Sequence, residues 1–310
     1  MKIVFFGSPA SALPSFKKLL EAGHRLELVI AQPDKPRGRG KKLTPPPVKD
    51  LAQESKIPCY QPHKIRKDSE AFEKIKNIKP DLIVVVAYGQ IIPASIIYLP
   101  KHNSVNLHFS LLPKYRGASP VQWALLKGEV KTGLTIFQLN EKMDEGDILS
   151  QEEVEILPDE KAYELEARLA EMGAELLVKT ISQIDEIHPL KQDHAQATYA
   201  PKLKKDDGRI DWANDALFID RQVRAFTLWP SAFAFLNDKR VKIIEGKVKE
   251  EPIHSSSPGK ILAVSKTGIE VCCGRRSSYL IQKLQPENKK AMDAYAFFLG
   301  AKIEIGDTFS

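Results

Sequence analysis

Three short, mainly apolar runs, of which the third is β-branched without polar alternation, restrict the fold more than any other feature. The runs cover residues 2–6, 26–31 and 81–87, and the last contains Ile83-Val84-Val85-Val86. Continuous apolar strands are covered on both faces, as happens when helices pack on the two sides of a parallel sheet. The pattern predicts an α/β domain with a Rossmann-like open sheet, in which ligands bind beyond the carboxyl ends of the strands.

Turn residues and further periodicities extend this domain along the chain. Gly7-Ser8-Pro9 turns the first strand into an amphipathic helix. The elements expected next are a helix over 12–22, strands over 105–109, 134–139 and 148–156, and a helix over 120–127. A long amphipathic helix is expected to begin at Pro158-Asp159, with one apolar face made of Leu165, Leu169, Met172, Leu176 and Ile184.

The last third of the chain has a different pattern. A length of 310 residues favours two domains, and residues 188–208 are rich in Pro, Lys, Asp and Gln. Beyond them, a helix over 217–225 and short apolar segments predict a small β-barrel with strands at 233–236, 241–244, 259–264, 268–272 and 279–284. The sequence therefore divides into a Rossmann-like domain at 1–188, a linker at 189–207 and a barrel domain at 208–310.

Composition and missing motifs exclude several classes of protein. No run of roughly 18 to 20 apolar residues is present, as a membrane helix would need, and Gly7 interrupts the first apolar run before a signal peptide could form. Three cysteines, two of them adjacent, give neither a disulfide framework nor metal-ligand spacing. Gly-x-Ser-x-Gly, a phosphate-binding loop and a dinucleotide fingerprint are missing as well. We expect a cytoplasmic protein without a metal or a nicotinamide cofactor.

Asn106, His108 and Asp144 form the strongest candidate site. Asn106 and His108 lie two residues apart in an expected strand, so their side chains share one face. Asp144 follows in the turn-like stretch Met143-Asp144-Glu145-Gly146-Asp147 and offers a carboxylate to the imidazole. Each residue also has a structural interpretation: a strand cap, a hydrogen-bonded core histidine and a turn aspartate. Composition alone does not favour Asp144 over Asp147.

A basic segment follows the second strand. It contains Lys35, Arg37, Arg39, Lys41 and Lys42, and we expect its Gly and Pro residues to prevent regular structure. Such a loop has the charge to follow phosphates, although most charge runs are solvated surface. The net charge is +6, and residues 208–310 hold 16 Lys and Arg against 12 Asp and Glu, which gives the last domain a basic face as well.

Several motifs together resemble the folate-dependent formyltransferase superfamily. The resemblance rests on Asn106-Leu107-His108, Ser110-Leu111-Leu112-Pro113, Tyr115-Arg116-Gly117 and Asp144. It extends along both domains through Phe6-Gly7-Ser8-Pro9, the basic loop, Ala87-Tyr88-Gly89-Gln90-Ile91-Ile92, Ser119-Pro120-Val121-Gln122 and the barrel. The chain departs from the family at the first turn, where Ser8 and Ser11 stand in place of the usual Thr and Phe.

The resemblance implies transfer of a formyl group from 10-formyltetrahydrofolate to the amino group of methionine on the initiator tRNA. A free α-amino group has a pKa of about 7.7 to 8.0, so a neutral nucleophile is available and no covalent enzyme intermediate is needed. By the resemblance, Asn106 and a protonated His108 stabilise the oxyanion, while Asp144 holds His108 charged and oriented.

The same resemblance assigns the binding residues. Folate is expected at Val86, Ala87, Tyr88, Gly89, Gln90, Ile91, Ile92, Ser110, Leu111, Leu112 and Pro113. Lys35, Arg37, Arg39, Lys41 and Lys42 are expected to enter the acceptor-stem groove of the tRNA, and an OB-like barrel to contact its inner side. We expect a monomer with no obligate protein partner.

Three alternatives stay open at this point. A formyltransferase acting on a small amine, such as a nucleotide sugar or glycinamide ribonucleotide, shares the three polar residues without requiring the basic loop. A formyl-folate hydrolase uses water in place of the amine. A tRNA-binding module with an inactive site is the non-enzyme alternative, and the presence of all three polar residues disfavours it.

Overall fold

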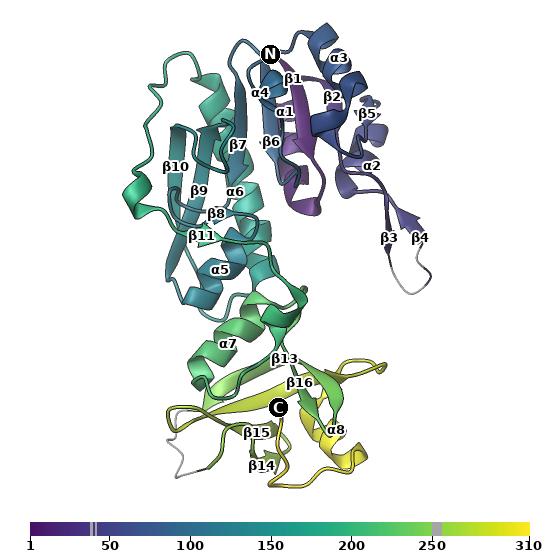
Figure 1. Cartoon of the computed structure of the whole chain (residues 1–310), viewed down its shortest axis with the longest axis vertical. Helices are drawn as coiled ribbons and strands as arrows, with labels where there is room; N and C mark the ends of the chain where they lie inside the picture. The colour runs from purple at the N-terminus through teal and green to yellow at the C-terminus, as the bar shows by residue number, and fades with distance from the viewer. Residues whose placement is uncertain (38–39, 41, 250–255) are drawn as a thin grey trace. The chain divides into compact units, whose positions relative to one another are not determined.

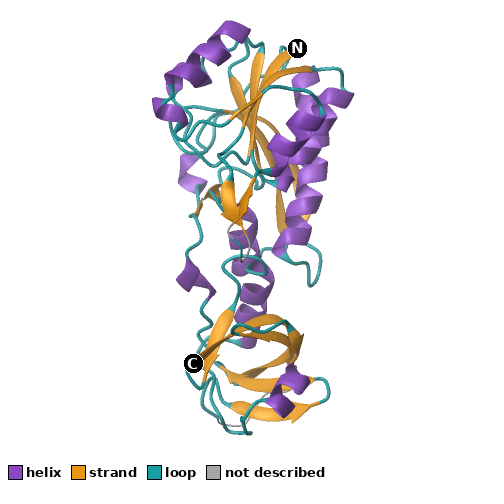
Figure 2. Cartoon of the chain, turned by 90° about the vertical axis from the view of Figure 1, so that its right-hand side faces the viewer, coloured by secondary structure: helices purple, strands orange, loops and turns teal. Residues whose placement is uncertain are grey.

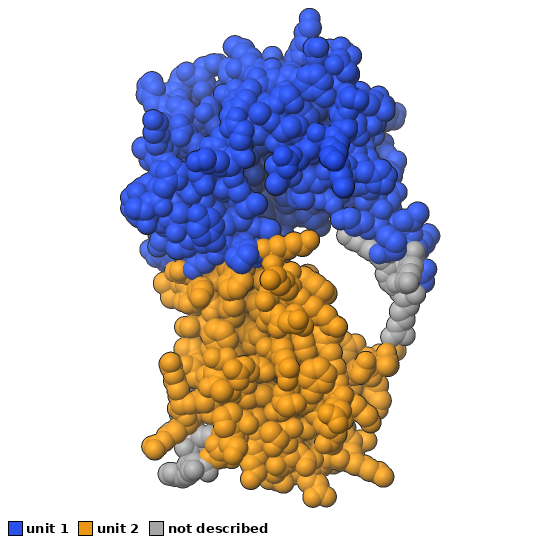
Figure 3. All heavy atoms as spheres, in the orientation of Figure 1, with its two compact units in different colours: residues 1–120, 131–156, 165–201 blue, residues 121–130, 157–164, 202–310 orange. Residues whose placement is uncertain are grey.

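The computed structural model describes residues 1–37, 40, 42–249 and 256–310. The chain forms two compact units, which Figure 3 shows in different colours. Unit 1 comprises residues 1–120, 131–156 and 165–201, and unit 2 comprises residues 121–130, 157–164 and 202–310. Within the described residues, none of the helices combines the length and the apolar composition that a bilayer-spanning helix requires.

Unit 1 is built on a seven-stranded sheet, counted over the described residues, with the order β10-β9-β7-β6-β1-β2-β5 (Figure 1). The strands are β1 (Lys2–Gly7), β2 (Arg25–Ile30), β5 (Cys59–Tyr60), β6 (Leu82–Val86), β7 (Ser104–His108), β9 (Lys131–Gln138) and β10 (Ile148–Glu155). The pairs from β5 to β7 are parallel, and β9 and β10 run antiparallel to their neighbours. The expected open α/β sheet is confirmed, and β9 and β10 make it a mixed one.

Helices cover both faces of this sheet (Figure 2). They are α1 (Leu13–Glu21), α2 (Pro47–Glu54), α3 (Ser69–Ile78), α4 (Ala94–Ile97) and α6 (Ala162–Ser182), and short 3-10 helices of the same unit lie at Ala10–Ala12, Ile65–Lys67 and His194–Gln196. α5 (Pro120–Lys127), apart from its first residue, and the 3-10 helix at Lys205–Gly208 belong to unit 2. β6 is buried at every position, which explains its lack of polar alternation. The sequence patterns predicted α1 and α5 but missed α2, α3 and α4.

The start of α6 was predicted wrongly. The helix begins at Ala162 instead of Pro158, because Glu160 accepts a hydrogen bond from the Leu157 N–H in the preceding turn. Glu164, in the first turn of α6, accepts one from the N–H of Lys161, the residue before the helix. Its last residue is Ser182, so Ile184 lies beyond the helix. Leu165, Leu169 and Leu176 are buried as expected.

The basic segment was also predicted wrongly as irregular. Its flanks pair as a hairpin of β3 (Lys35–Arg37) and β4 (Lys42–Thr44), with Pro36 opposite Leu43. A two-stranded ribbon has two open edges, and proline is tolerated in an edge strand because its missing N–H can face solvent. Arg39 and Lys41 lie outside the described residues.

Unit 2 contains an antiparallel sheet, with the order β12-β13-β16-β15-β14 and with β17 beside β16. The strands are β12 (Phe233–Leu236), β13 (Lys239–Lys249), β14 (Ile261–Ser265), β15 (Gly268–Cys273), β16 (Ser277–Pro286) and β17 (Met292–Asp293), with helices α7 (Ala216–Ala225) and α8 (Ala294–Gly300). Residues 307–310 bridge the two end strands, because Ser310 exchanges hydrogen bonds with Phe235 and Asp307 accepts one from Ile261. The expected C-terminal β domain is confirmed.

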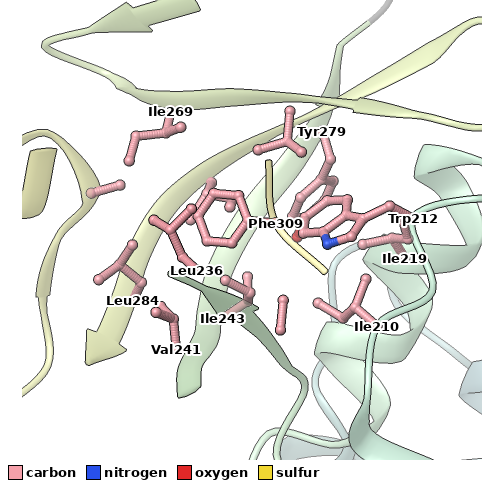
Figure 4. Close-up of a cluster of buried hydrophobic side chains, with 14 of the residues drawn as sticks. Ile210, Trp212, Ile219, Leu236, Val241, Ile243, Ile269, Tyr279, Leu284 and Phe309 are labelled. Atoms are coloured by element: carbon pink, nitrogen blue, oxygen red, sulfur yellow. The ribbon is translucent and has the colours of Figure 1, made fainter. Parts of the chain in front are cut away.

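The core of unit 2 is one cluster of buried side chains that pack against this sheet (Figure 4). Trp212 and Phe309 pack with their ring centroids 5.8 Å apart, and Tyr279 is buried beside them. α7 contributes Ile219 to the same cluster. Side chains from β strands, α7 and the C-terminal segment therefore share one core.

Candidate active site

Asn106 and His108 lie on β7, in the interior of the sheet of unit 1. β7 pairs with β6 on one side, where Asn106 lies opposite Val85, and with β9 on the other, where Asn106 lies opposite Phe137. Asn106 is partly exposed, whereas the His108 side chain is only 7% exposed. The expectation that both residues occupy one strand is confirmed, and the two bonded neighbours fix the backbone beneath them.

The two ring nitrogens of His108 have different surroundings. Nε2 lies 2.9 Å from the backbone carbonyl oxygen of Tyr115, and because a carbonyl only accepts, we assign the hydrogen of the neutral ring to Nε2. Nδ1 lies 3.9 Å from Asp144 Oδ2, which is too long for a hydrogen bond but short enough for an ion pair. Nδ1 is therefore the nitrogen that can take up a proton facing a carboxylate.

Asp144 is held in a turn between β9 and β10. Its φ of +53° lies in the left-handed region, which Asp tolerates better than most residues. Oδ2 accepts a hydrogen bond of 2.7 Å from the backbone N–H of Gly117, and the side chain is 12% exposed. Of the two aspartates weighed for this role, Asp144 is thus the one whose carboxylate lies beside His108.

The segment after β7 is tied to its neighbours by short hydrogen bonds. Ser110 Oγ donates to the Lys114 carbonyl oxygen at 2.6 Å. Thr135 Oγ1 donates to the Ser110 carbonyl oxygen at 2.6 Å and accepts from the Leu112 N–H at 3.1 Å. The Leu112 side chain is buried, while Leu111 and Pro113 are half-buried. Ser110 and Leu112 of the expected folate residues therefore hold the loop together.

The segment 87–92 directs its side chains alternately inward and outward. Tyr88 packs edge-on against Phe6 with centroids 5.1 Å apart, and burial raises the pKa of its hydroxyl far above the ordinary value. Ile92 is buried, Gln90 accepts a hydrogen bond from the Ile65 N–H, and Val86 is buried in β6. The exposed members are Ala87, Gly89 and Ile91, so the loop offers a ligand its backbone at two small residues and the apolar side chain of Ile91.

A cavity of about 350 Å³ lies at the Asp144 turn and another of about 220 Å³ at the carboxyl ends of β1, β2 and β6. The second cavity lies at the topological switch point of the sheet, because β2 pairs with one edge of β1 and β6 pairs with the other. Open α/β sheets usually bind ligands at this point. Its lining residues are Ser8, Pro9, Gln32, Pro33, Lys35, Thr44, Pro46, Ala87, Tyr88 and Gly89.

The β3–β4 hairpin is fastened at its base. Lys35 Nζ donates to Gln32 Oε1 at 2.6 Å, and Gln32 Nε2 donates to the Tyr88 carbonyl oxygen at 2.8 Å. Beside them, Gln61 and Lys49 bind the Asp34 carboxylate. Hydrogen bonds from Gln61 and then from Lys49 lower the pKa of Asp34 below its ordinary 3.8. The structure thus brings Lys35 to the same cavity as Ala87 and Gly89.

Gln192 was not predicted to belong to the site, because it lies in the expected linker. Its side chain is buried and contacts both the Asp144 turn and Arg116. Arg116 was recognised as part of a motif, but its almost complete burial was not expected. A polar residue in a polar segment gives no periodic signal, so one sequence alone does not reveal this position.

A search of the described residues for three or more His, Cys, Asp or Glu side chains placed to hold a metal ion finds no such group. The polar side chains of the predicted site are instead the amide of Asn106 on the same strand, the imidazole of His108 and the carboxylate of Asp144 beside it. This set is suited to binding a developing oxyanion and to moving a proton.

Comparisons with known proteins agree with this geometry. The family model Formyl transferase matches residues 1–181, and the model Formyl transferase, C-terminal domain, matches residues 202–302. A methionyl-tRNA formyltransferase from Geobacter sulfurreducens is 44% identical over 308 residues, covering 99% of this chain and 96% of that relative. The chain belongs to the methionyl-tRNA formyltransferase family. Its member from Thermodesulfovibrio yellowstonii is 45% identical over 311 residues, covering 99% of each chain.

Solved structures share the fold of this methionyl-tRNA formyltransferase family member at lower identity. The N-formyltransferase from Helicobacter canadensis, in complex with folinic acid and dTDP-3-aminofucose, has a TM-score of 0.67 at 19% identity and covers 92% of this chain and 99% of its own. HypX from Aquifex aeolicus, in complex with tetrahydrofolic acid, has a TM-score of 0.66 at 19% identity, with 100% and 50% covered. The two-part architecture is therefore common to formyltransferases and HypX.

Proposed function

We propose that this chain transfers the formyl group of 10-formyltetrahydrofolate to the amino group of methionine on the initiator tRNA. The product is N-formylmethionyl-tRNA for translation initiation. The observation that carries the proposal is the membership of the whole chain in the methionyl-tRNA formyltransferase family, and the pairing of His108 Nδ1 with the Asp144 carboxylate supports it.

The chemistry follows from the surroundings of β7. The neutral amine attacks the formyl carbon, a carbon–nitrogen bond forms and the carbonyl oxygen becomes an oxyanion. The Asn106 amide donates a hydrogen bond to that oxygen. His108, with Nε2 committed to the Tyr115 carbonyl, donates through protonated Nδ1, and Asp144 stabilises the imidazolium charge. The bond to the folate nitrogen then breaks, and a proton passes from the attacking amine to that nitrogen with His108 assisting.

Substrate binding is assigned to three surfaces. We propose that residues 86–92 and 110–113 bind folate, and the cavity beside Ala87 and Gly89 supports this. We propose that Lys35, Arg37, Arg39, Lys41 and Lys42 contact the acceptor stem of the tRNA, which the exposure of Lys35 and Lys42 supports. The basic C-terminal domain contacts the rest of the tRNA.

The organisation of the chain completes the proposal. The catalytic domain is 1–188, the linker 189–207 and the tRNA-binding domain 208–310, and the protein acts as a cytoplasmic monomer. The first part of the linker is fastened to unit 1, since Tyr199 and Ala200 pair with Arg116 and Gly117. The linker is therefore not a free chain along its whole length.

The test measures formylation of methionyl initiator tRNA with 10-formyltetrahydrofolate, against methionyl elongator tRNA. His108→Ala is the loss-of-function variant, and His188→Ala, a change at an exposed histidine, is the matched control. Formylation of the initiator alone, lost in His108→Ala only, is the expected result. Formate release without an acceptor identifies a hydrolase, and transfer to small amines in place of tRNA identifies a small-amine formyltransferase.

A further inference from the structure

Residues 190–200, here named the strap, are bonded along their length to the two segments that surround His108. Leu190 and Ile148 exchange two backbone hydrogen bonds of 2.8 Å after the Asp144 turn. The backbone N–H of Arg116 donates to the Thr198 carbonyl oxygen at 2.9 Å, and β11 (Tyr199–Ala200) pairs in parallel with β8 (Arg116–Gly117). The strap thus joins the Asp144 turn to the segment that follows β7.

Gln192 is the buried centre of the strap. Its side-chain Nε2 donates to the carbonyl oxygens of Asp144 at 2.9 Å and of Gly146 at 2.7 Å. Its Oε1 accepts from Arg116 Nε at 3.1 Å and from Nη2 at 2.7 Å. An amide has two N–H donors and two lone pairs, so the hydrogen-bonding capacity of this side chain is fully used.

Arg116 continues the connection back to the catalytic carboxylate. Its guanidinium is 1% exposed, and Nη1 lies 3.6 Å from Glu145 Oε1. The residue after it, Gly117, donates its N–H to Asp144 Oδ2. Asp144 is therefore held at its backbone carbonyl by Gln192 and at its carboxylate by the neighbour of the arginine that Gln192 binds. Gln192 makes the first of these contacts directly and binds the side chain of the residue before the one that makes the second.

We propose that Gln192 is a positioning residue for formyl transfer, which fixes the Asp144 turn so that the carboxylate stays beside His108 Nδ1. The inference rests on the roles proposed above for His108 and Asp144. The left-handed conformation of Asp144 persists because its surroundings determine it, and Gln192 supplies two of the hydrogen bonds that do so. Glutamine suits this position because it offers donors to the turn and acceptors to Arg116 at the same time.

Two variants separate positioning from a general structural role. Gln192→Ala removes the donors and the acceptors, whereas Gln192→Glu keeps acceptors for Arg116 and replaces the donors to the turn by a carboxylate oxygen, which repels the two carbonyl oxygens. We expect both to lower kcat by up to about 100-fold, as a misplacement of a catalytic group by about 1 Å can do, with KM for methionyl-tRNA within about twofold. The matched control is Gln196→Ala, an exposed glutamine of the same strap.

A second readout does not depend on turnover. The NMR signals of the His108 ring should move in Gln192→Ala, because a displaced Asp144 carboxylate changes the surroundings of Nδ1, whereas Gln196→Ala should leave them in place. Wild-type kcat in Gln192→Glu, or unchanged His108 ring signals in Gln192→Ala, would overturn the proposal. Should Gln192→Ala fail to fold, Gln192→Glu decides through kcat. A wild-type protein that does not formylate methionyl-tRNA would refute the proposed function, while the His108 ring signals would still test the positioning.

Discussion

The turn that carries Asp144 and the β3–β4 hairpin both follow strands of the same sheet, but they are held in different ways. The turn is fastened by the buried side chain of Gln192 and by the N–H of Gly117. The hairpin is fastened at its base by Asp34 and Lys49, whose side chains are 31% and 21% exposed, and Lys35 and Lys42 are exposed along its strands. A catalytic group displaced by about 1 Å can slow bond formation about 10²-fold, whereas phosphate contacts act through charge and tolerate adjustment.

The comparison predicts that the largest loss of activity comes from the fixed region. Asn106→Ala removes an oxyanion donor and should lower kcat about 10²- to 10³-fold. The free energy of unfolding should change little, because Asn106 is partly exposed. Single-turnover formylation and urea denaturation measure the two effects. Asn77→Ala, the same change on an exposed face of α3, is the control, and equal activity of both variants would remove Asn106 from the mechanism.

A substitution at Gly117 should damage both the stability and the activity of the fixed region. Gly117 has a φ of +125°, and a Cβ there would lie 2.5 Å from the carbonyl oxygen of Ala200. Gly117→Ala should therefore cost roughly 1 to 3 kcal/mol of unfolding free energy. It should also lower kcat at least about 10-fold, because the displaced hydrogen bond lets the Asp144 carboxylate move away from His108.

Gly300→Ala is the control for this variant, because a Cβ at Gly300 meets no atom within 4 Å. Urea denaturation followed by circular dichroism gives the stabilities. A Gly117→Ala protein that equals the wild type in stability and kcat would show that the segment after β7 adapts as readily as the hairpin.

Charge removal in the hairpin should affect binding and leave catalysis almost unchanged. Lys42→Ala should raise KM for methionyl-tRNA with little change in kcat. Each lost phosphate contact should also reduce the slope of log KM against log salt by roughly 0.7 to 0.9. Steady-state formylation between 50 and 200 mM KCl measures this slope. Lys17→Ala, on an exposed position of α1, serves for comparison, and a matching slope change in both variants would contradict a hairpin contact.

The smallest expected effect concerns the base of the hairpin and depends on pH. Because the folded-state pKa of Asp34 is lowered from its ordinary 3.8 by Gln61 and Lys49, ionised Asp34 stabilises the fold above about pH 4. This contribution is lost as the pH falls through the lowered value. Asp34→Asn should therefore shift the urea midpoint downward by a constant amount at neutral pH, and the shift should shrink as the pH approaches 3. A shift independent of pH would show that the charge of Asp34 is not involved.

The sequence predicted the parts of the fold that depend on hydrophobic pattern. The runs at β1, β2 and β6 are apolar because both faces of these strands are covered, and the alternation of β10 fits the edge strand it forms. Two predictions were wrong for local reasons. Glu160 and Glu164 accept hydrogen bonds from the backbone N–H groups of Leu157 and Lys161. The helix α6 therefore begins at Ala162, later in the sequence than predicted. Pro36 was expected to break regular structure, but it fits a ribbon with open edges.

The site was predicted only where spacing along one strand carries information. Asn106 and His108 are two residues apart, so the sequence alone placed them on one face. The contact between His108 and Asp144 spans β9, and the choice of Asp144 over Asp147 came from the family resemblance. Gln192 lies 48 residues from Asp144 and contacts it only after the chain folds. Long-range hydrogen bonds of this kind leave no local pattern for a sequence to reveal.

The left-handed backbone of Asp144 also limits which substitutions position 144 tolerates. Gly, Asn and Asp adopt this conformation at the lowest cost, so Gly and Asn are the substitutions at position 144 that disturb the backbone least. Neither carries the negative charge that faces His108. Substitution here should therefore produce folded proteins that bind methionyl-tRNA without formylating it. Such proteins would act as competitive inhibitors of the functional enzyme in the same cell.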